Sequence, residues 1–271
     1  MELLNKNIVI TGAASGIGEA LARHFLRLKA NVFLSDRNQK KLGFVAEKLG
    51  CAHHVCDVGK EEDILALVKQ VNAVLGHIDL FCSNAGIFFK DEFISSELDN
   101  QYWTESWHIN VMSHVYAARH VLPQMIQRRS GYFLQIISAA ALLSQIGASA
   151  YSATKSAALS FAESLAISNG LNGIKVSAVC PQYVATPMLG FNDPKASRDI
   201  NNLISPDEAA LQIIDGVLQG KFLIVTDTDA IKFFERKCKD YDRWIAGMQS
   251  LRDKIIQEPG EINLGQMHKF I

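Results

Sequence analysis

Residues 11–18 read Thr11-Gly12-Ala13-Ala14-Ser15-Gly16-Ile17-Gly18 and follow directly on a short apolar run, Ile8-Val9-Ile10. An apolar run followed by closely spaced glycines is typical of a β-strand that turns into an α-helix. Glycines at such a turn let the backbone approach a pair of phosphates, and the helix N-terminus that follows favours their negative charge. The stretch therefore predicts a dinucleotide-binding turn at the start of an α/β fold.

Strand-like runs alternate with segments of helical periodicity along most of the chain. Their interiors are apolar rather than alternating, as expected for a parallel sheet that is covered by helices on both faces. This alternation predicts a single-domain, Rossmann-like, doubly wound α/β fold. The predicted strands are Asn7–Thr11, Asn31–Ser35, Ala52–Cys56, Leu80–Ser83, Phe133–Ser138, Val176–Cys180 and Phe222–Thr226.

The bulk composition excludes several classes of protein. The chain has 271 residues, of which 48% are hydrophobic and 20% charged, and this suits one domain with a large core. A formal net charge of -1 gives no electrostatic basis for nucleic-acid binding. We expect no membrane partner and a cytoplasmic location, because the sequence shows neither a long apolar span nor a signal-peptide pattern. The five cysteines lack C-x-x-C spacing, so we expect buried reduced thiols and no metal site.

The C-terminal segment differs from the rest of the chain. Its apolar residues from Ile231 to Ile255 are spaced by threes and fours, and charged residues fill the other faces. This pattern predicts one long amphipathic helix or two shorter ones. We divide the chain into a dinucleotide-binding catalytic domain, 1–227, with a substrate loop at about 187–205, and a helical extension, 228–271. Three arrangements of the extension are open. It packs on its own domain, it crosses a partner subunit, or it covers the mouth of the active site.

Polar or special residues follow six of the predicted strands. In a doubly wound sheet, ligands bind beyond the carboxyl ends of the strands. A carboxylate at Asp36 suits the two ribose hydroxyls of an adenosine and repels a 2′-phosphate, which favours NAD(H) over NADP(H). Arg37 could pair with that phosphate, so NADP remains the less favoured alternative. The residues at the strand ends are Gly12, Asp36, Asp57, Asn84, Ser138 and the segment Pro181–Thr186.

Tyr151 and Lys155 lie four residues apart in the predicted helix Ala150–Ser168, so they share one face. To act as a base near neutrality, a tyrosine needs its pKa of about 10 lowered by roughly three units. A neighbouring ammonium supplies part of that shift by stabilising the phenolate, and an oxidised nicotinamide supplies more. Ser138 can donate a hydrogen bond to a developing alkoxide. Asn110, on an otherwise apolar helix, indicates a helix interruption or a bound water.

Taken together, the glycine turn, Asn84-Ala85-Gly86, Asn110, Ser138, Tyr151 and Lys155 resemble the short-chain dehydrogenase/reductase family. The resemblance spans about residues 5–225. It implies a seven-stranded parallel sheet and a catalytic tetrad. In that tetrad Tyr151 is the acid/base and Ser138 orients and polarises the carbonyl. Lys155 holds the nicotinamide ribose and lowers the pKa of Tyr151, and Asn110 anchors a water that continues a proton relay.

The same resemblance implies a set of residues that bind the cofactor. Asp57 and Val58 would line the adenine pocket, the Asn-Ala-Gly segment would border the two riboses, and Thr186 would bind the carboxamide. The full implied set is Gly12, Ser15, Gly16, Ile17, Gly18, Asp36, Arg37, Asp57, Val58, Asn84, Ala85, Gly86, Tyr151, Lys155, Pro181, Val184 and Thr186.

Two positions depart from the family pattern. Pro181 is followed by Gln182 where the family has glycine, and this side chain either contacts substrate or turns outward. Many members also carry Gly-Gly after the last strand, which helps to build a tetramer, whereas this chain continues into its charged extension. The predicted helix at 150–168 is apolar nearly all round, which predicts a helix buried on both sides in a dimer. A homodimer and a homotetramer both stay open.

The substrate pocket is predicted to be mostly apolar, which favours a hydrophobic or aromatic secondary alcohol and its ketone. A mobile loop would close over the bound cofactor. An NAD-dependent epimerase or dehydratase is a second hypothesis, and a non-catalytic NAD-binding regulator is a third. The glycine spacing and the lack of a larger C-terminal domain disfavour the second, and the complete tetrad disfavours the third. The predicted pocket residues are Ala140, Leu142, Gln145, Gln182, Tyr183, Met188 and Leu189.

Overall fold

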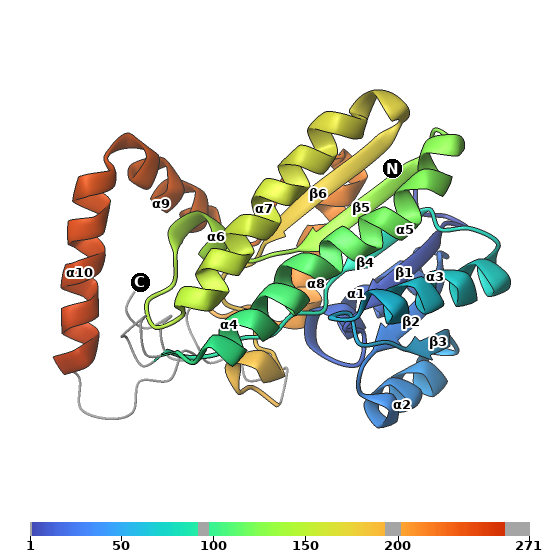
Figure 1. Cartoon of the computed structure of the whole chain (residues 1–271), viewed down its shortest axis with the longest axis horizontal. Helices are drawn as coiled ribbons and strands as arrows, with labels where there is room; N and C mark the ends of the chain where they lie inside the picture. The colour runs from blue at the N-terminus through green and yellow to red at the C-terminus, as the bar shows by residue number, and fades with distance from the viewer. Residues whose placement is uncertain (1, 92–97, 193–201, 258–271) are drawn as a thin grey trace.

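A computed structural model of the chain describes residues 2–91, 98–192 and 202–257, and within these ranges seven strands form one parallel sheet (Figure 1). The strand order is β3-β2-β1-β4-β5-β6-β7, so the direction of winding reverses between β1 and β4. A crevice for ligands is expected at such a reversal. The doubly wound fold is thereby confirmed. The strands are β1 Asn7–Thr11, β2 Asn31–Asp36, β3 Ala52–Val55, β4 Leu80–Ser83, β5 Gly131–Ile136, β6 Ile174–Cys180 and β7 Leu223–Val225.

Helices cover both faces of this sheet. Apolar residues of α1, α2 and α8 pack on one face, and those of α3, α5 and α7 pack on the other. The α-helices are α1 Gly16–Arg27, α2 Gln39–Leu49, α3 Glu61–Leu75, α4 Asn100–Trp107, α5 Ser113–Gln127, α6 Ala140–Leu143, α7 Ser149–Asn169, α8 Pro206–Gln219, α9 Thr228–Lys239 and α10 Tyr241–Gln257. Shorter turns are the π-helix His108–Met112 and the 3₁₀ helices Gly170–Asn172 and Pro187–Leu189.

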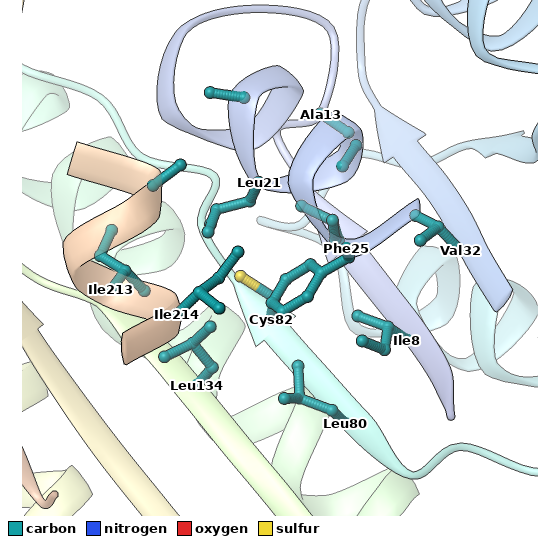
Figure 2. Close-up of a cluster of buried hydrophobic side chains, with 14 of the residues drawn as sticks. Ile8, Ala13, Leu21, Phe25, Val32, Leu80, Cys82, Leu134, Ile213 and Ile214 are labelled. Carbon is teal, nitrogen blue, oxygen red and sulfur yellow. The ribbon is translucent and has the colours of Figure 1, made fainter. Parts of the chain in front are cut away.

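One apolar cluster fixes α1 against the sheet (Figure 2). Phe25 of α1 is fully buried and lies among side chains of the strands, including Ile8 and Leu80. Ile213 and Ile214 of α8 close the same cluster from the side. This packing holds the N-terminus of α1 beyond the carboxyl end of β1, where a phosphate would meet the helix.

Several element boundaries differ from the predicted ones. Strand β5 ends at Ile136, so Ser138 lies two residues beyond the strand rather than on it. The extension forms two helices, α9 and α10, which are separated by the extended residue Asp240. Figure 1 shows this pair beyond the end of the sheet near α6, and α9 contacts α6. Residues 193–201 of the predicted substrate loop and residues 258–271 of the predicted extension lie outside the described residues.

Helix α7 is buried on one face only in this single chain. Ala158, Ala162 and Leu165 pack into the core, whereas Ile167 is 84% exposed. The predicted burial of both faces therefore does not arise within one chain. Over the described ranges, none of the helices has the length and apolar character that crossing a membrane requires.

Candidate active site

The glycine positions of the turn leave little room for a side chain. Gly12 and Gly16 have positive φ angles of +63° and +56°, a backbone region that favours glycine. A Cβ atom on Gly12 would lie 2.8 Å from the Cα atom of Ala85. A Cβ atom on Gly18 would overlap the carbonyl oxygen of Gly12 and lie 2.6 Å from Nδ2 of Asn84. The turn is therefore packed directly against the segment that follows β4.

Asn84 holds this turn in place. Its Nδ2 donates to the carbonyl oxygens of Thr11 and Gly12 at 2.9 and 3.0 Å. The hydroxyl oxygen of Thr11 accepts hydrogen bonds from the backbone N–H groups of Asn84 and Ala85 at 3.0 and 3.2 Å. The Asn84 amide thus stabilises the glycine turn. The sequence predicts a second role for this residue, beside the cofactor.

A cleft of about 250 Å³ runs along the carboxyl ends of the strands and brings most of the predicted residues together. Gly18 lies behind this lining, where it packs against the turn. The predicted residues that line the cleft are Gly12, Ser15, Gly16, Ile17, Asp36, Arg37, Asp57, Val58, Asn84, Ala85, Gly86, Ser138, Tyr151, Lys155, Pro181, Gln182, Val184, Thr186, Met188 and Leu189.

Six further lining residues were not predicted. They lie at strand ends or in the loops and helices next to them, and nothing in their sequence pattern distinguishes them from ordinary apolar core. They are Cys56, Ile87, Ile109, Ile136, Ile137 and Pro187.

The Asp36 carboxylate is fixed beside the glycine turn. Its Oδ2 accepts the backbone N–H of Ala14 at 3.2 Å, and its Oδ1 accepts that of Asn38 at 2.8 Å. Both Asp36 and Arg37 line the cleft. The carboxylate thus presents a fixed negative charge at the end of β2, as the sequence predicts.

Tyr151 and Lys155 of α7 and Ser138, from the segment that follows β5, line the same cleft. The Ser138 hydroxyl lies close enough to the Tyr151 phenol to lower its pKa. The Lys155 ammonium lies 5.5 Å from the centre of the Tyr151 ring, and its Nζ donates to the carbonyl oxygen of Ile136 at 3.4 Å. Phe88 packs edge-on against the Tyr151 ring, with 5.3 Å between ring centres. These contacts fix the phenol at the cleft with a hydroxyl and an ammonium as neighbours.

Burial controls the protonation of these groups. It raises the pKa of Tyr151, and the Ser138 hydroxyl acts in the opposite direction. Burial lowers the pKa of Lys155 to about 8. These protein groups alone therefore do not lower the pKa of Tyr151 as the sequence argument expects, because desolvation of the phenolate outweighs its stabilisation. Cys180, which ends β6 beside them, is kept a neutral thiol because burial raises its pKa to about 12.

Asn110 interrupts the helical path between α4 and α5. It lies within the π-helical turn His108–Met112 and is fully buried. Its Oδ1 accepts the backbone N–H of Ile87, and its Nδ2 donates to the carbonyl oxygen of Ile87, both at 3.0 Å. Nδ2 also contacts Oγ1 of Thr154 at 3.2 Å. The side chain therefore ties the segment after β4 to α7.

The predicted substrate residues divide into two groups. Gln182, Met188 and Leu189 line the cleft, and Oε1 of Gln182 is buried with no hydrogen-bond partner among the described residues. The cleft lining within the described ranges does not include the other four predicted residues, which are Ala140, Leu142, Gln145 and Tyr183.

The helix α6 explains why Ala140 and Leu142 do not line the cleft. Because residues 140–143 are helical, Ala140 and Leu142 turn inward and are only 7% and 2% exposed. Tyr183 packs in a separate apolar cluster, and Gln145 borders a second groove. Lys195 and Arg198 of the predicted loop lie outside the described residues.

The low pKa of Lys155 gives a stability prediction. Because its folded-state pKa of about 8 lies below the usual value of 10.5, the unfolded chain binds more protons between these two pH values. Native stability therefore rises with pH in that window. We expect Lys155→Met to be more stable than the native protein near pH 7, with the advantage shrinking by about 2 kcal/mol towards about pH 9.5.

Urea unfolding of both proteins at the two pH values measures this change. Lys175→Met serves as the matched control, because Lys175 is an exposed lysine on β6. Its stability difference from the native protein should be the same at both pH values. A pH-independent difference for Lys155→Met would contradict the prediction.

Comparison with known proteins agrees with this geometry. The protein-family model for short chain dehydrogenase matches residues 6–196 of the chain. The chain is 32% identical over 221 residues to epidermal retinol dehydrogenase 2 of Mus musculus, covering 78% of this chain and 71% of that protein. It is 34% identical over 193 residues to oxidoreductase UcpA of Escherichia coli (strain K12), covering 69% and 72%.

A solved structure shares the fold. It is the short chain dehydrogenase/reductase from Burkholderia phymatum in complex with NAD, with a TM-score of 0.82 and 22% identity. The similarity covers 89% of this chain and 96% of that one. At this identity the likeness concerns the fold alone. With the sequence matches and the site geometry together, the chain belongs to the short-chain dehydrogenase/reductase family of oxidoreductases.

Proposed function

We propose that this protein transfers a hydride between NAD(H) and a hydrophobic or aromatic secondary alcohol or its ketone, with Tyr151 as the general acid/base. One observation carries the proposal. Tyr151, Ser138 and Lys155 line the same cleft as the glycine turn and Asp36. A proton-transfer group thus shares one cavity with the features expected of a dinucleotide site.

The residues present fit an NAD molecule. Gly12, Ser15 and Gly16 line the cleft, so the backbone of the glycine turn and the N-terminus of α1 face the place where a pyrophosphate would lie. Asp36 supplies a fixed carboxylate at the place expected to bind an adenosine ribose. The family neighbour from Burkholderia phymatum was solved with NAD, which supports the same cofactor here.

The side chains have separate tasks in the proposed reaction. During oxidation the Tyr151 phenolate takes the proton of the substrate hydroxyl, while Ser138 donates a hydrogen bond to the substrate oxygen. Bound NAD⁺ supplies the acceptor for the hydride that leaves the carbinol carbon. In the reverse direction Tyr151 returns the proton to the alkoxide. Lys155, with its pKa of about 8, is mostly protonated near neutrality and stabilises the phenolate.

The walls of the cleft favour an apolar substrate. Met188 and Leu189 line the side that follows β6. The name of the mouse relative, a retinol dehydrogenase, is in keeping with an apolar alcohol. We propose that the buried Oε1 of Gln182, which no described residue satisfies, accepts a hydrogen bond from a donor group of the bound cofactor or of a water.

A direct assay tests this function. Purified protein is mixed with NAD or NADP and a panel of secondary alcohols and ketones, and the absorbance of the reduced nicotinamide is followed. We expect turnover with NAD(H) and apolar members of the panel. Absence of turnover with every member would contradict the proposal.

The Asp36 carboxylate should control the choice between NADH and NADPH. We expect Asp36→Asn to lower the ratio of NADH to NADPH affinity about a hundredfold, because a charge-assisted hydrogen bond is lost and a repulsion is removed. Fluorescence titration with both nucleotides measures the ratio. Asp215→Asn on α8 is the matched control and should leave it unchanged. A native preference for NADPH would show that Arg37 outweighs Asp36.

We also propose that the chain forms a homodimer or homotetramer in the cytoplasm. The exposed apolar end of α7 and the turn after it support an interface between subunits. Ile167 is 84% exposed, and Leu171 is fully exposed in the single chain. Sedimentation of the purified protein would report the number of subunits.

A further inference from the structure

Helix α9 reaches back to the segment that carries Ser138, although it begins beyond the residues that the family model matches. The Nζ atom of Lys237 on α9 donates a hydrogen bond to the carbonyl oxygen of Leu142 on α6 at 2.7 Å. Phe234, three residues earlier on the same face of α9, packs against the apolar cluster that contains Leu142. The extension is therefore attached to α6 by a hydrogen bond and by apolar packing.

Helix α6 in turn fixes the Ser138 side chain. The Oγ atom of Ser138 accepts the backbone N–H of Ala140 at 3.1 Å, and the carbonyl oxygen of Ser138 accepts that of Ala141 at 3.0 Å. The first of these bonds uses the hydroxyl oxygen only as an acceptor, so its hydrogen remains available for donation. The first turn of α6 thus sets the direction in which the Ser138 hydroxyl can donate.

This helix is too short to hold its own shape. It has four residues, and helices of that length are unstable in isolation. It ends at Ser144, whose φ of +62° lies in the left-handed region that is unfavourable for residues other than glycine. The last carbonyl groups of a helix also lack partners within that helix. The structure of α6 therefore depends on donors from neighbouring elements.

Two side chains supply those donors. The Ser156 hydroxyl of α7 donates to the carbonyl oxygen of Ala141 at 3.1 Å, and the Lys237 ammonium donates to that of Leu142. A hydrogen bond from a charged donor is stronger than one from a neutral hydroxyl. The Lys237 ammonium is also partly buried, and its Nζ lies 5.5 Å from the centre of the Tyr241 ring. Lys237 is thus held in place beside the C-terminal end of α6.

We propose that Lys237 is a positioning residue for catalysis, which acts through α6 to keep the Ser138 hydroxyl directed at the substrate oxygen. The proposal rests on the proposed function, because it takes Ser138 to donate to the substrate. Over the described ranges, the residues that line the cleft include none from α9. The extension therefore contributes to the reaction without touching substrate or cofactor.

Hydrogen exchange measures the attachment of α6 without any need for turnover. The backbone N–H groups of residues 141–144 are all hydrogen-bonded within this turn, so their exchange reports its opening. Lys237→Met removes the ammonium and keeps an unbranched apolar side chain. We expect these amides to exchange at least tenfold faster in Lys237→Met, because a hydrogen bond from a charged group is lost. Exchange in α1 should stay at the native rate.

Two further variants serve as controls in the same experiment. Lys237→Arg retains a charged donor that can reach the Leu142 carbonyl, so it should keep exchange at residues 141–144 close to the native rate. Lys239→Met removes an exposed lysine from the same helix and should leave exchange unchanged.

Kinetics distinguishes positioning from a general loss of stability. We expect Lys237→Met to lower kcat for alcohol oxidation about tenfold while the Kd for NADH stays at its native value. In a Ser138→Ala background the same substitution should have no further effect on kcat, because the group it positions is already absent. Lys237→Arg should restore most of the native kcat.

Native exchange rates at residues 141–144 in Lys237→Met would overturn the proposal. A tenfold loss of kcat that persists in the Ser138→Ala background would also overturn it, because Lys237 would then act by another route. Faster exchange in a protein whose native form turns over no alcohol or ketone would instead contradict the proposed function, while the attachment of α6 by Lys237 would stand.

Discussion

Tyr151→Phe is expected to lower kcat/KM for alcohol oxidation about a thousandfold, within the usual range for loss of a general acid/base. The variant keeps the ring that packs against Phe88 and loses only the phenol hydroxyl, which faces Ser138. The substrate hydroxyl then loses the proposed acceptor of its proton. Steady-state kinetics with the best alcohol of the panel, together with NADH titration, measures the effect.

The two readouts separate catalysis from binding. We expect the affinity for NADH to change little, because the ring and Lys155 stay in place. Tyr116→Phe on α5 is the matched control and should retain native activity. If Tyr151→Phe turned over substrate at the native rate, another group would have to move the proton. If it lost NADH binding as well, the role of Tyr151 would be structural.

The second large effect is expected for Gly18→Ala. The added methyl group would overlap the carbonyl oxygen of Gly12 and crowd the Asn84 amide, whose hydrogen bonds hold the glycine turn. Overpacking of this kind costs about 1–3 kcal/mol of stability. We also expect NADH affinity to fall at least tenfold, because the turn must shift away from its position. Thermal unfolding and NADH titration measure the two effects.

A second glycine provides the control for that experiment. Gly43 lies within α2, and no heavy atom comes within 4 Å of a Cβ atom built on it. Gly43→Ala should therefore raise stability by about 0.5–1 kcal/mol through the higher helix propensity of alanine. NADH affinity should stay unchanged. An equal loss of affinity in both variants, or none in Gly18→Ala, would contradict the packing described for the turn.

The fold and the cofactor side of the cleft could be predicted because their signals are local. An apolar run before glycines predicts β1 and the turn, and a four-residue spacing places Tyr151 and Lys155 on one helix face. The carboxyl ends of parallel strands meet at one edge, so Asp36 and Ser138, which lies just beyond β5, could be assigned to one cleft. These inferences need no knowledge of which side chains touch.

The substrate side could not be predicted in the same way, because its contacts are between distant segments. Leu142 is apolar and near Ser138, but whether it faces a pocket depends on the short helix α6. Asn110 has a recognisable position, yet its partner Ile87 lies in a loop that carries no signal of that pairing. Likewise, the periodicity of the extension predicts an apolar stripe, and only the fold reveals that Ile255 meets Tyr183.

The direction of the pKa shift of Tyr151 also could not be predicted from the sequence. A lysine one turn away predicts a lowered pKa, but sequence spacing gives no measure of how deeply the phenol is buried. In the structure burial dominates and raises the pKa. We infer that the charge of bound NAD⁺ provides the compensating stabilisation of the phenolate, so alcohol oxidation should accelerate as pH rises through the pKa of Tyr151 in the complex.

The most direct test of direct hydride transfer in this cleft uses an isotopic label. A secondary alcohol such as cyclohexanol, carrying deuterium at its carbinol carbon, is incubated with the protein and NAD⁺, and the NADH formed is analysed by mass spectrometry. We expect every molecule of NADH to gain one deuterium from the alcohol. Formation of ketone with unlabelled NADH, or no reduction of NAD⁺ with any secondary alcohol, would contradict it.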